Sequence, residues 1–527
     1  AQLLREQAEV PTDFIIASDS DRIQLFREVT PELTERERNQ ALDRIGQAKN
    51  LLVLPGDLGP DHEALQIDLL LYQRYQDALS ANQMLDFDDL ILQMVKWLEE
   101  VPDQLTLLRS RFCWISVDEY QDVNFAQYRL LQLLAGDGRG LCAIGDPDQA
   151  IYGFRGADRT YFLRFHDDFA GAKRIELEQN YRSTQMILQA SYQVISQEAD
   201  RAAMQVWSDF VDQTRLDLYQ AATDKAEAEY VIHQIEQMVG GTSYFSLDSG
   251  RVDDDDELAN RSFGDFAILV RLSAQMPPII EALERSGIPY QAVGRTPLVE
   301  LKEIQEILAY LWLLANPNSQ YLRDKIEKRL QAPLLIDPFI GDLRQQVGQL
   351  PVTEFIETID AFILEQHPNR DRESRRENVQ RFGRLAISFE TRLLLFLETM
   401  ALQRDADVYD ARADRVTLMS LHASKGLEFP VVFMTGCEES ILPYELGRHQ
   451  ADVDEERRLF YVGMTRAQQK LILSHAKSRV LFGQYLQNQP SRFVDDIEQS
   501  LKELKKMAPS KPKAAKPEAV QLGLFGV

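Results

Sequence analysis

Short apolar runs separated by longer polar stretches give this chain its first level of organisation. The runs at 112–117, 141–144 and 266–270 are typical of buried strands in a parallel sheet. Between such runs, apolar residues recur at helical spacing, as they do between residues 224 and 240. The pattern predicts an α/β fold in which strands and helices alternate along the chain.

Acidic residues follow two of the predicted strands. Asp118 and Glu119 come directly after the run at 112–117, and the polar segment 145–149 follows the run at 141–144. Ligands of open α/β sheets lie beyond the carboxyl ends of the strands, and Mg²⁺ prefers carboxylate ligands. Strand, acid pair, helix, strand and polar loop is the layout of a nucleoside-triphosphatase core. An isolated Asp-Glu pair, by contrast, could simply cap a strand.

Five blocks in order carry a resemblance to a known family. Residues 118–122 (DEYQD) and 145–156 (GDPDQAIYGFRG) resemble motifs II and III of the UvrD/PcrA/Rep-type superfamily 1A DNA helicases. Residues 179–184 (QNYRST) match motif IV, residues 421–429 (LHASKGLEF) resemble motif V, and residues 455–467 (EERRLFYVGMTRA) resemble motif VI. The resemblance implies two RecA-like parallel-sheet motor domains, the first N-terminally incomplete, with two helical insertion subdomains.

The same resemblance predicts where the domains begin and end. Residues 85–90 are expected to start a structural helix rather than to form a second metal site, and 240–260 is an exposed acidic loop without a recognised motif. The expected divisions are 1–80 (helical 1B-like subdomain), 81–178 (rest of motor 1A), 179–316 (first part of motor 2A), 317–407 (short 2B-like subdomain), 408–500 (second part of 2A) and 501–527 (flexible basic tail).

Residues matching the family's motifs are the candidates for a site that binds ATP and Mg²⁺. The resemblance implies that Asp118 and Glu119 hold the metal, while Glu119 also orients or deprotonates the attacking water. Several arginines around one triphosphate would be unfavourable without an anion to pair with them. The implied catalytic residues are Glu119, Gln149, Arg182 and Arg466, and the implied nucleotide-binding residues are Asp118, Arg155, Tyr181 and Glu428.

A second group of candidates is expected to bind single-stranded DNA and single/double-strand junctions. Tyr152 and Phe154 would stack on bases, although the family usually has Trp where Phe154 stands. The alternative is that both rings belong to the core. Ser420, where the family usually has Thr, and His422 complete the group. The implied activity is an ATP-dependent single-stranded DNA translocase and helicase, 3′→5′ by resemblance, acting in DNA repair or replication.

The phosphate-binding loop of such an enzyme does not occur in the sequence. No Gly-x-x-x-x-Gly-Lys-Ser/Thr occurs, and the dipeptide Gly-Lys is absent from all 527 residues. In the family this loop precedes the region that resembles residues 1–7, so we expect it upstream of Ala1 and expect this chain alone to be inactive. The alternative is an ATPase-incompetent DNA-binding scaffold derived from a helicase.

Composition excludes several other classes of protein. The net charge of −25 argues against a protein that coats DNA nonspecifically, but a local basic groove remains compatible with it. No apolar run approaches the length of a membrane span, so no membrane partner is expected.

Cys113, Cys142 and Cys437 lie far apart, and the first two fall in predicted buried strands. This argues for a reducing compartment and against zinc or iron–sulfur sites. A cytoplasmic, nucleoid-associated protein is expected.

The C-terminal residues predict a protein partner. Gln521-Leu522-Gly523-Leu524-Phe525 resembles the peptide by which bacterial polymerases and repair proteins dock on the β sliding clamp. Gly523 departs from the usual Ser or Asp. An apolar peptide at the end of a lysine-rich tail is typical of a segment kept for a partner's pocket. The predicted contacts are Gln521, Leu522, Leu524 and Phe525, unless the tail folds back on the second motor.

Overall fold

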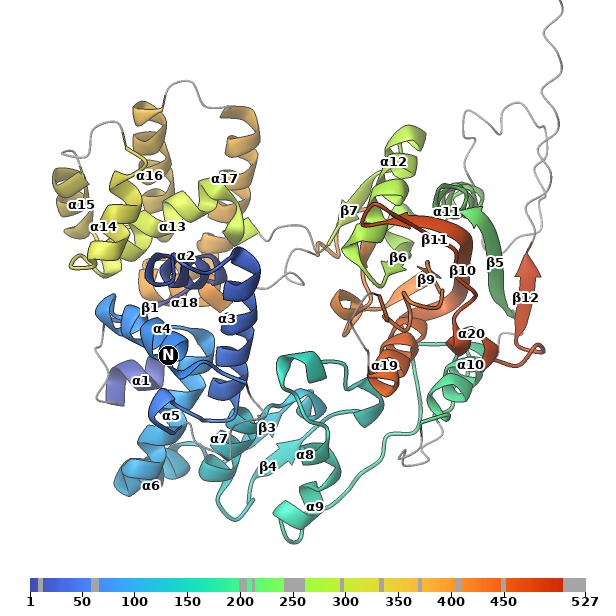
Figure 1. Ribbon diagram of the computed structural model, residues 1–527, viewed down its shortest axis with the longest axis horizontal. Helices are drawn as coiled ribbons and strands as arrows, with labels where there is room; N and C mark the ends of the chain where they lie inside the picture. Colours follow the sequence, from blue (N-terminus) through green and yellow to red (C-terminus); the bar gives the residue numbers. More distant parts are fainter. Residues whose placement is uncertain are drawn as a thin grey trace, which may run out of the picture.

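The computed structural model describes three regions of the chain (Figure 1). We call them the helical lobe (the described residues within 1–111 and 298–402), motor 1 (residues 112–178) and motor 2 (the described residues within 179–293 and 409–505). The described residues are 1–7, 13–57, 66–198, 206–210, 214–240, 261–293, 298–330, 336–367, 372–402, 409–446 and 452–505.

The helical lobe combines two segments that are far apart in the sequence. The N-terminal segment contains a two-stranded parallel pair and six helices: α1 (Gln2–Gln7), β1 (Ile15–Ile16), α2 (Asp19–Val29), α3 (Glu35–Asn50), α4 (Leu69–Ala81), β2 (Met84–Leu85), α5 (Phe87–Glu100) and α6 (Pro102–Arg111). The second segment contains α13 (Lys302–Ala315), α14 (Gln320–Glu327), α15 (Ile336–Arg344), α16 (Val352–Gln366), α17 (Arg372–Ala386) and α18 (Leu393–Leu402).

These two segments share one hydrophobic core, and in Figure 1 the α13–α18 group lies directly against α2 and α3. Arg5 Nε donates to Glu398 Oε1 over 2.8 Å, and Tyr321 Oη donates to Asp21 Oδ1 over 2.8 Å. Helix α13 was expected within motor 2A, but its buried face belongs to this shared core, so the predicted boundary at residue 316 is wrong. Its all-round apolar sequence suits a central helix in a bundle.

The start of α5 confirms the structural interpretation of the acidic stretch at 85–90. Asp86 is the N-cap and accepts from the backbone N–H of Asp89 at 2.9 Å, while the Asp89 carboxylate caps in return. The buried Lys49 ammonium lies 2.8 Å from both carboxylates. The two acids are therefore paired with Lys49, and Arg22 lies 3.7 Å from Asp86 as a second cation, as buried charges require.

Motor 2 is built around one eight-stranded sheet with the order β12-β5-β10-β9-β6-β8-β7, in which β11 pairs antiparallel with β10 and the other pairs are parallel. Its elements are α10 (Gln185–Ile195), β5 (Leu216–Thr223), α11 (Asp224–Met238), β6 (Phe266–Val270), α12 (Met276–Ser286), β7 (Tyr290–Ala292), β8 (Val416–Ser420), β9 (Phe429–Met434), α19 (Val453–Met464), β10 (Ala467–Leu481), β11 (Gln484–Leu486), α20 (Arg492–Asp495) and β12 (Lys502–Lys505).

Both faces of this sheet are covered. Along β6, Ala267 and Leu269 belong to the core that includes residues of α10 and α19, whereas Phe266, Ile268 and Val270 belong to the core with α11 and α12. This is the two-residue alternation of a strand, with apolar side chains on both faces. All five residues are buried, which confirms the predicted strand at 266–270.

Motor 1 is much smaller. Its elements are β3 (Ile115–Val117), α7 (Phe125–Ala135), β4 (Leu141–Ala143), α8 (Thr160–Leu163) and α9 (Phe165–Asp168), and β3 pairs parallel with β4. The strand predicted at 112–117 is therefore shorter, and its burial was predicted wrongly. Trp114 is 86% exposed, and Cys113 and Cys142 are also exposed. Among the described residues nothing covers this face of the pair.

The C-terminal boundary also needs correction. The tail was expected to begin at residue 501, but Leu501 and Lys502 are buried, and β12 pairs with β5 at the edge of the motor 2 sheet. Most of the acidic loop at 240–260 and all of the clamp-like peptide lie outside the described residues. Within the described part of the chain, no helix is both long and apolar enough to cross a membrane.

Candidate nucleotide and DNA site

The two predicted metal-binding acids lie where the sequence places them. β3 ends at Val117, and Asp118 and Glu119 follow at its carboxyl end, both exposed. Glu119 has a φ of 52° and a ψ of 41°, the left-handed region that non-glycine residues rarely adopt. Its backbone N–H donates to Asp118 Oδ1 over 3.0 Å. Such backbone strain is concentrated at functional sites.

Gln121 joins this segment to the loop after β4. Its amide nitrogen donates to Glu119 Oε2, and its Oε1 accepts from the backbone N–H of Asp146 at 3.0 Å. A Cβ at Gly145 would lie 2.3 Å from Gln121 Oε1, which accounts for the glycine there. The acid pair and the polar loop are thus fixed to each other by one buried side chain.

Arg466 follows α19 directly and is the most unusual charged group of the site. Its side chain is only 1% exposed, and no carboxylate forms an ion pair with it in the described part of the chain. It donates to the Val462 and Leu427 carbonyl oxygens and to Gln149 Oε1, at 2.9, 3.2 and 3.3 Å. Burial, and then the neighbouring Arg182, lower its pKa to about 10. An anion between the two arginines would relieve this repulsion.

Arg182 lies close to Arg466, on the side of motor 2 that contacts motor 1. Its Nε donates to Glu428 Oε2 over 2.6 Å, and its Nη1 lies 3.4 Å from the Thr465 carbonyl oxygen. Tyr181, on the preceding position, is 75% exposed, as a ring that stacks on an adenine would need to be. The structure thus brings together Arg182, Glu428, Gln149 and Arg466, with Asp118 and Glu119 joined to them through Gln149's loop.

Lys425 is a residue of this site that the sequence reasoning did not select. Its ammonium lies 3.2 Å from Glu119 Oε2, donates to the Gln149 carbonyl oxygen over 2.8 Å and pairs with Asp122. Burial raises the pKa of Asp122, while Lys425 opposes that shift. Lys425 lies within the block that resembles motif V, so the sequence could have identified it as a candidate. The sequence could not identify its partners on motor 1, because they lie some 300 residues away.

The DNA candidates form a separate group next to the nucleotide candidates. The Phe154 and His422 rings meet edge-on with centroids 5.4 Å apart, and the Tyr152 centroid lies 6.1 Å from that of Phe154. Phe154 is 60% exposed, which is incompatible with a core role, whereas Tyr152 is partly buried. The Arg155 guanidinium lies over the Tyr152 and Phe154 rings, next to the DNA candidates, and its expected contact with nucleotide stays a prediction.

The remaining two DNA candidates come from motor 2. Ser420 ends β8, and its Oγ accepts from the backbone N–H of Ala423. His422 follows in a short 3₁₀ turn, and burial, together with Arg271 and Arg155, lowers its pKa to about 3. The imidazole is therefore neutral at physiological pH. A neutral ring beside the exposed Phe154 ring suits contact with bases rather than with phosphates.

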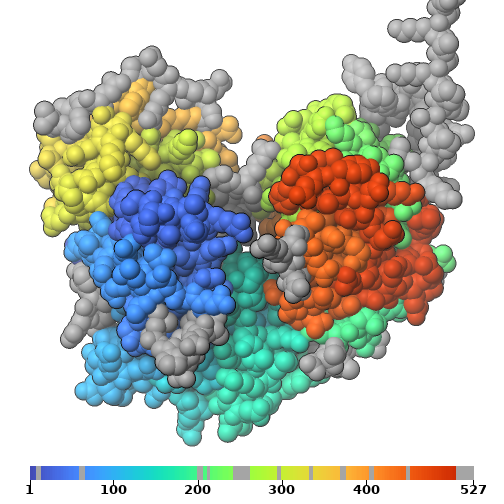
Figure 2. Space-filling model, in the orientation of Figure 1, coloured from blue at the N-terminus to red at the C-terminus, as the bar shows by residue number. Residues whose placement is uncertain are grey.

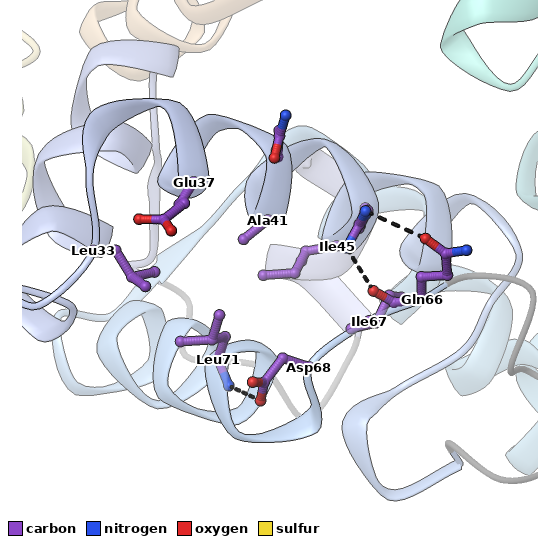
Figure 3. Close-up of a pocket in the computed structure, with 10 residues that line it drawn as sticks. Leu33, Glu37, Ala41, Ile45, Gln66, Ile67, Asp68 and Leu71 are labelled. Atoms are coloured by element: carbon purple, nitrogen blue, oxygen red, sulfur yellow. Dashed lines mark hydrogen bonds between the residues drawn. The ribbon is translucent and has the colours of Figure 1, made fainter.

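The site lies between motor 1 and motor 2, as the contacts of Lys425 with Glu119 and of Arg466 with Gln149 show. Figure 2 shows motor 1 (teal) at the base, between the helical lobe (blue and yellow) and motor 2 (orange and red). A cavity of about 220 Å³ lies elsewhere, between α3 and the start of α4 (Figure 3). Its lining residues include Ala41, Ile45 and Leu71, with Arg44 bonded to Gln66 at one end. None of the predicted site residues lines this cavity.

Comparison with known proteins covers both parts of the chain. Residues 2–170 match the UvrD/REP helicase N-terminal domain, and residues 175–334 and 348–478 match the UvrD-like helicase C-terminal domain. The ATP-dependent DNA helicase PcrA of Bacillus subtilis strain 168 is 34% identical over 93% of this chain and 73% of its own length. The proteins of that name from Staphylococcus aureus strain Mu50 and Leuconostoc citreum are 33% and 32% identical, each over 95% of this chain and about three quarters of their own length.

Proposed function

Because this chain belongs to the UvrD/REP helicase family, we propose that it is the motor of an ATP-dependent helicase that translocates along single-stranded DNA in the 3′→5′ direction. Its setting would be DNA repair or replication at the cytoplasmic nucleoid. The observation that carries the proposal is Arg466, a buried guanidinium without a carboxylate partner in the described chain, next to a second arginine. A triphosphate is the ligand that this pair of cations fits best.

The residues present also fit a magnesium ion bound together with that triphosphate. Asp118 offers an exposed carboxylate at a strand's carboxyl end, where it would hold Mg²⁺ with Glu119 nearby. When bound, the nucleotide would supply the phosphoryl group, and the metal would neutralise part of its negative charge. Glu119 orients and deprotonates the attacking water, while Arg182 and Arg466 stabilise the charge that develops in the transition state. Lys425 holds Glu119 in place from the opposite motor.

Coupling to DNA follows from where Gln149 lies. Its side chain contacts Arg466, and the loop that it begins carries Tyr152 and Phe154 only a few residues later. If nucleotide binding moves the Gln149 side chain, the loop that carries Tyr152 and Phe154 would therefore move with it, because the two are adjacent in the chain. Stacking on bases contributes about 1–3 kcal/mol each and tolerates any sequence, as a translocase needs.

The sequence given has no Gly-Lys phosphate loop, so we expect the 527-residue chain by itself to hydrolyse ATP poorly. The loop's amides and lysine are the main charge-assisted donors to the β- and γ-phosphates, each worth about 1.5–3 kcal/mol. The second hypothesis is a DNA-binding scaffold that does not hydrolyse ATP. The presence of Glu119, Arg182 and Arg466 together favours the enzyme.

The test measures DNA-stimulated ATP hydrolysis and single-strand affinity in the protein as encoded in its genome and in this 527-residue chain. In the encoded protein, Glu119→Gln and Arg466→Ala should each lower kcat about a thousandfold or more. Single-strand affinity should stay within about twofold, since neither side chain belongs to the aromatic group. Arg139→Ala, which removes an exposed arginine of motor 1, is the matched control and should change neither quantity.

DNA-stimulated hydrolysis that persists in both variants would contradict the assigned roles. Binding of DNA without any hydrolysis by the encoded protein would instead select the scaffold hypothesis. Robust hydrolysis by the 527-residue chain, abolished by Glu119→Gln, would show that the expected need for the phosphate loop is wrong. Unwinding assays on duplexes with a 3′ or a 5′ single-stranded tail decide the polarity.

We further propose that Gln521, Leu522, Leu524 and Phe525 bind the bacterial β sliding clamp. The support is the sequence of the peptide, whose apolar residues suit a partner's pocket. Affinity for the isolated peptide should be weak and should gain from tethering on DNA. A binding assay with purified clamp would compare the wild-type peptide with a Leu524→Ala/Phe525→Ala peptide. Equal signals, or no signal at high micromolar peptide, would remove the clamp as a partner.

A further inference from the structure

Helix α19 contacts the loop of motor 1 that follows Gln149 at three places. Arg466, just beyond its end, contacts the Gln149 side chain. Arg458 Nε, in its middle, donates to the Ala150 carbonyl oxygen over 2.7 Å. Near its start, Glu455 Oε1 accepts from the backbone N–H of Gly153 at 3.0 Å. One helix of motor 2 therefore holds the aromatic loop of motor 1 along its length.

The contact at Glu455 requires a glycine at position 153. A Cβ at Gly153 would lie 2.5 Å from Glu455 Oε2, so only glycine lets the carboxylate approach the backbone this closely. The Phe154 backbone also interacts favourably with the carboxylate. Glu455 is half-buried, and this burial raises the pKa of its carboxyl. A charged acceptor on a backbone N–H is among the stronger hydrogen bonds.

The neighbouring acids of the helix indicate that this contact is not merely a charge at a helix N-terminus. Asp452 caps the helix, accepting from the backbone N–H groups of Asp454 and Glu455. Glu456 binds Arg271 of motor 2 through both of its oxygens. Asp454 is exposed. Of these acids only Glu455 contacts motor 1, although all of them interact favourably with the helix dipole.

We propose that Glu455 is a positioning residue that holds the loop 151–156 so that Phe154 and Tyr152 are presented to single-stranded DNA. This inference rests on the proposed function, because it assumes that these rings bind DNA. Glu455 and Arg466 are eleven positions apart, which is about 16 Å along a helix. Helix α19 thus transmits the position of Arg466, at the nucleotide, to the backbone that carries the aromatic rings.

The experiment compares Glu455→Ala, Glu455→Gln and the matched control Asp454→Ala in the full protein. Asp454 lies next to Glu455 in the same helical turn, so its variant loses the same charge without the contact. Two quantities are measured: affinity for fluorescein-labelled oligothymidine, with and without a non-hydrolysable ATP analogue, and hydrogen exchange of the amides in residues 150–156.

Glu455→Ala should weaken DNA binding about tenfold, reduce the effect of the ATP analogue on affinity, and accelerate exchange at Gly153. Glu455→Gln keeps an oxygen acceptor for the Gly153 N–H and should stay within about threefold of wild type. Asp454→Ala should match the wild type. Gly153→Ala, which displaces the carboxylate without removing it, should reproduce Glu455→Ala and keeps the test valid if one variant fails to fold.

Equal affinity and equal exchange in Glu455→Ala and Asp454→Ala would overturn the inference. Faster exchange with unchanged DNA affinity would also overturn it, because the loop would then be held without any consequence for DNA. If the wild-type protein binds no oligothymidine, the proposed function fails. The exchange rates then still decide by themselves whether Glu455 holds the loop.

Discussion

The two motor sheets of this protein are made of similar strands but lie in opposite environments. In motor 2, the inner strands of the eight-stranded sheet are covered on both faces, and Phe433 and Val432 of the central strand β9 are fully buried on opposite sides. In motor 1, β3 and β4 form a pair whose apolar neighbours Trp114 and Ile144 face solvent. The apolar composition of a strand therefore does not determine its burial, which depends on the layers packed against it.

The difference matters because the nucleotide candidates come from both sides. Motor 1 supplies Asp118 and Glu119 from its exposed pair, and motor 2 supplies Arg182 and Arg466 from its covered sheet. Lys425 and Glu455 of motor 2 hold the loops of motor 1 in place. Side chains of motor 2 thus fix the position of two candidate loops of motor 1.

The largest expected effect contrasts one side chain from each sheet. Phe433→Ala should lower the free energy of unfolding by about 3–5 kcal/mol, because it opens a cavity in a fully buried core. Trp114→Ala should change it by less than about 0.5 kcal/mol, since that ring is mostly exposed. Urea unfolding followed by circular dichroism measures both. A Trp114→Ala loss as large as that of Phe433→Ala would show that the motor 1 face is covered in solution.

A medium effect is expected at the boundary between the motors, where His422 meets Phe154. The folded pKa of His422 is about 3, below its usual 6.5, so the unfolded state takes up the proton first. The resulting stability is fully present above pH 6.5 and is lost as the pH falls toward 3. About 1.6 kcal/mol should disappear between pH 6.5 and pH 5.

Urea unfolding at a series of pH values measures this loss, with His422→Gln as the variant that should flatten the profile. His233→Gln, on the exposed face of α11, serves as the control and should keep the wild-type slope. An unchanged slope in His422→Gln would mean that other groups dominate the acid response.

The smallest perturbation is chemical labelling, which leaves the folded protein intact. Cys113 and Cys142 of motor 1 are exposed and should react readily with a thiol reagent such as a maleimide. Cys437 of motor 2 is fully buried, and burial raises the pKa of its thiol well above the usual value. It should react at least about a hundredfold more slowly, as measured by mass spectrometry of native protein. Comparable rates would contradict the contrast between the two sheets.

The sequence by itself determined the chemistry and its order along the chain. Features that depend on neighbouring residues could be predicted. They are the acid pair after a strand, the polar loop after the next strand, the strand at 266–270 and the arginines of the later blocks. The helix start at Asp86 was readable for the same reason. The grouping of Gln149, Arg182, Glu428 and Arg466 followed from the family resemblance, and the structure brings these four side chains together.

Only the tertiary structure decided which surfaces are covered and which distant side chains meet. Three features differ from the prediction: the exposure of Trp114 and Cys113, the place of α13 in the helical lobe, and the strand β12. Lys425 pairs with Glu119, and Glu455 accepts a hydrogen bond from Gly153, although each pair is separated by some 300 positions in the sequence. Local patterns specify strands, helices and caps, whereas burial and ion pairing arise from long-range packing that no short stretch of sequence contains.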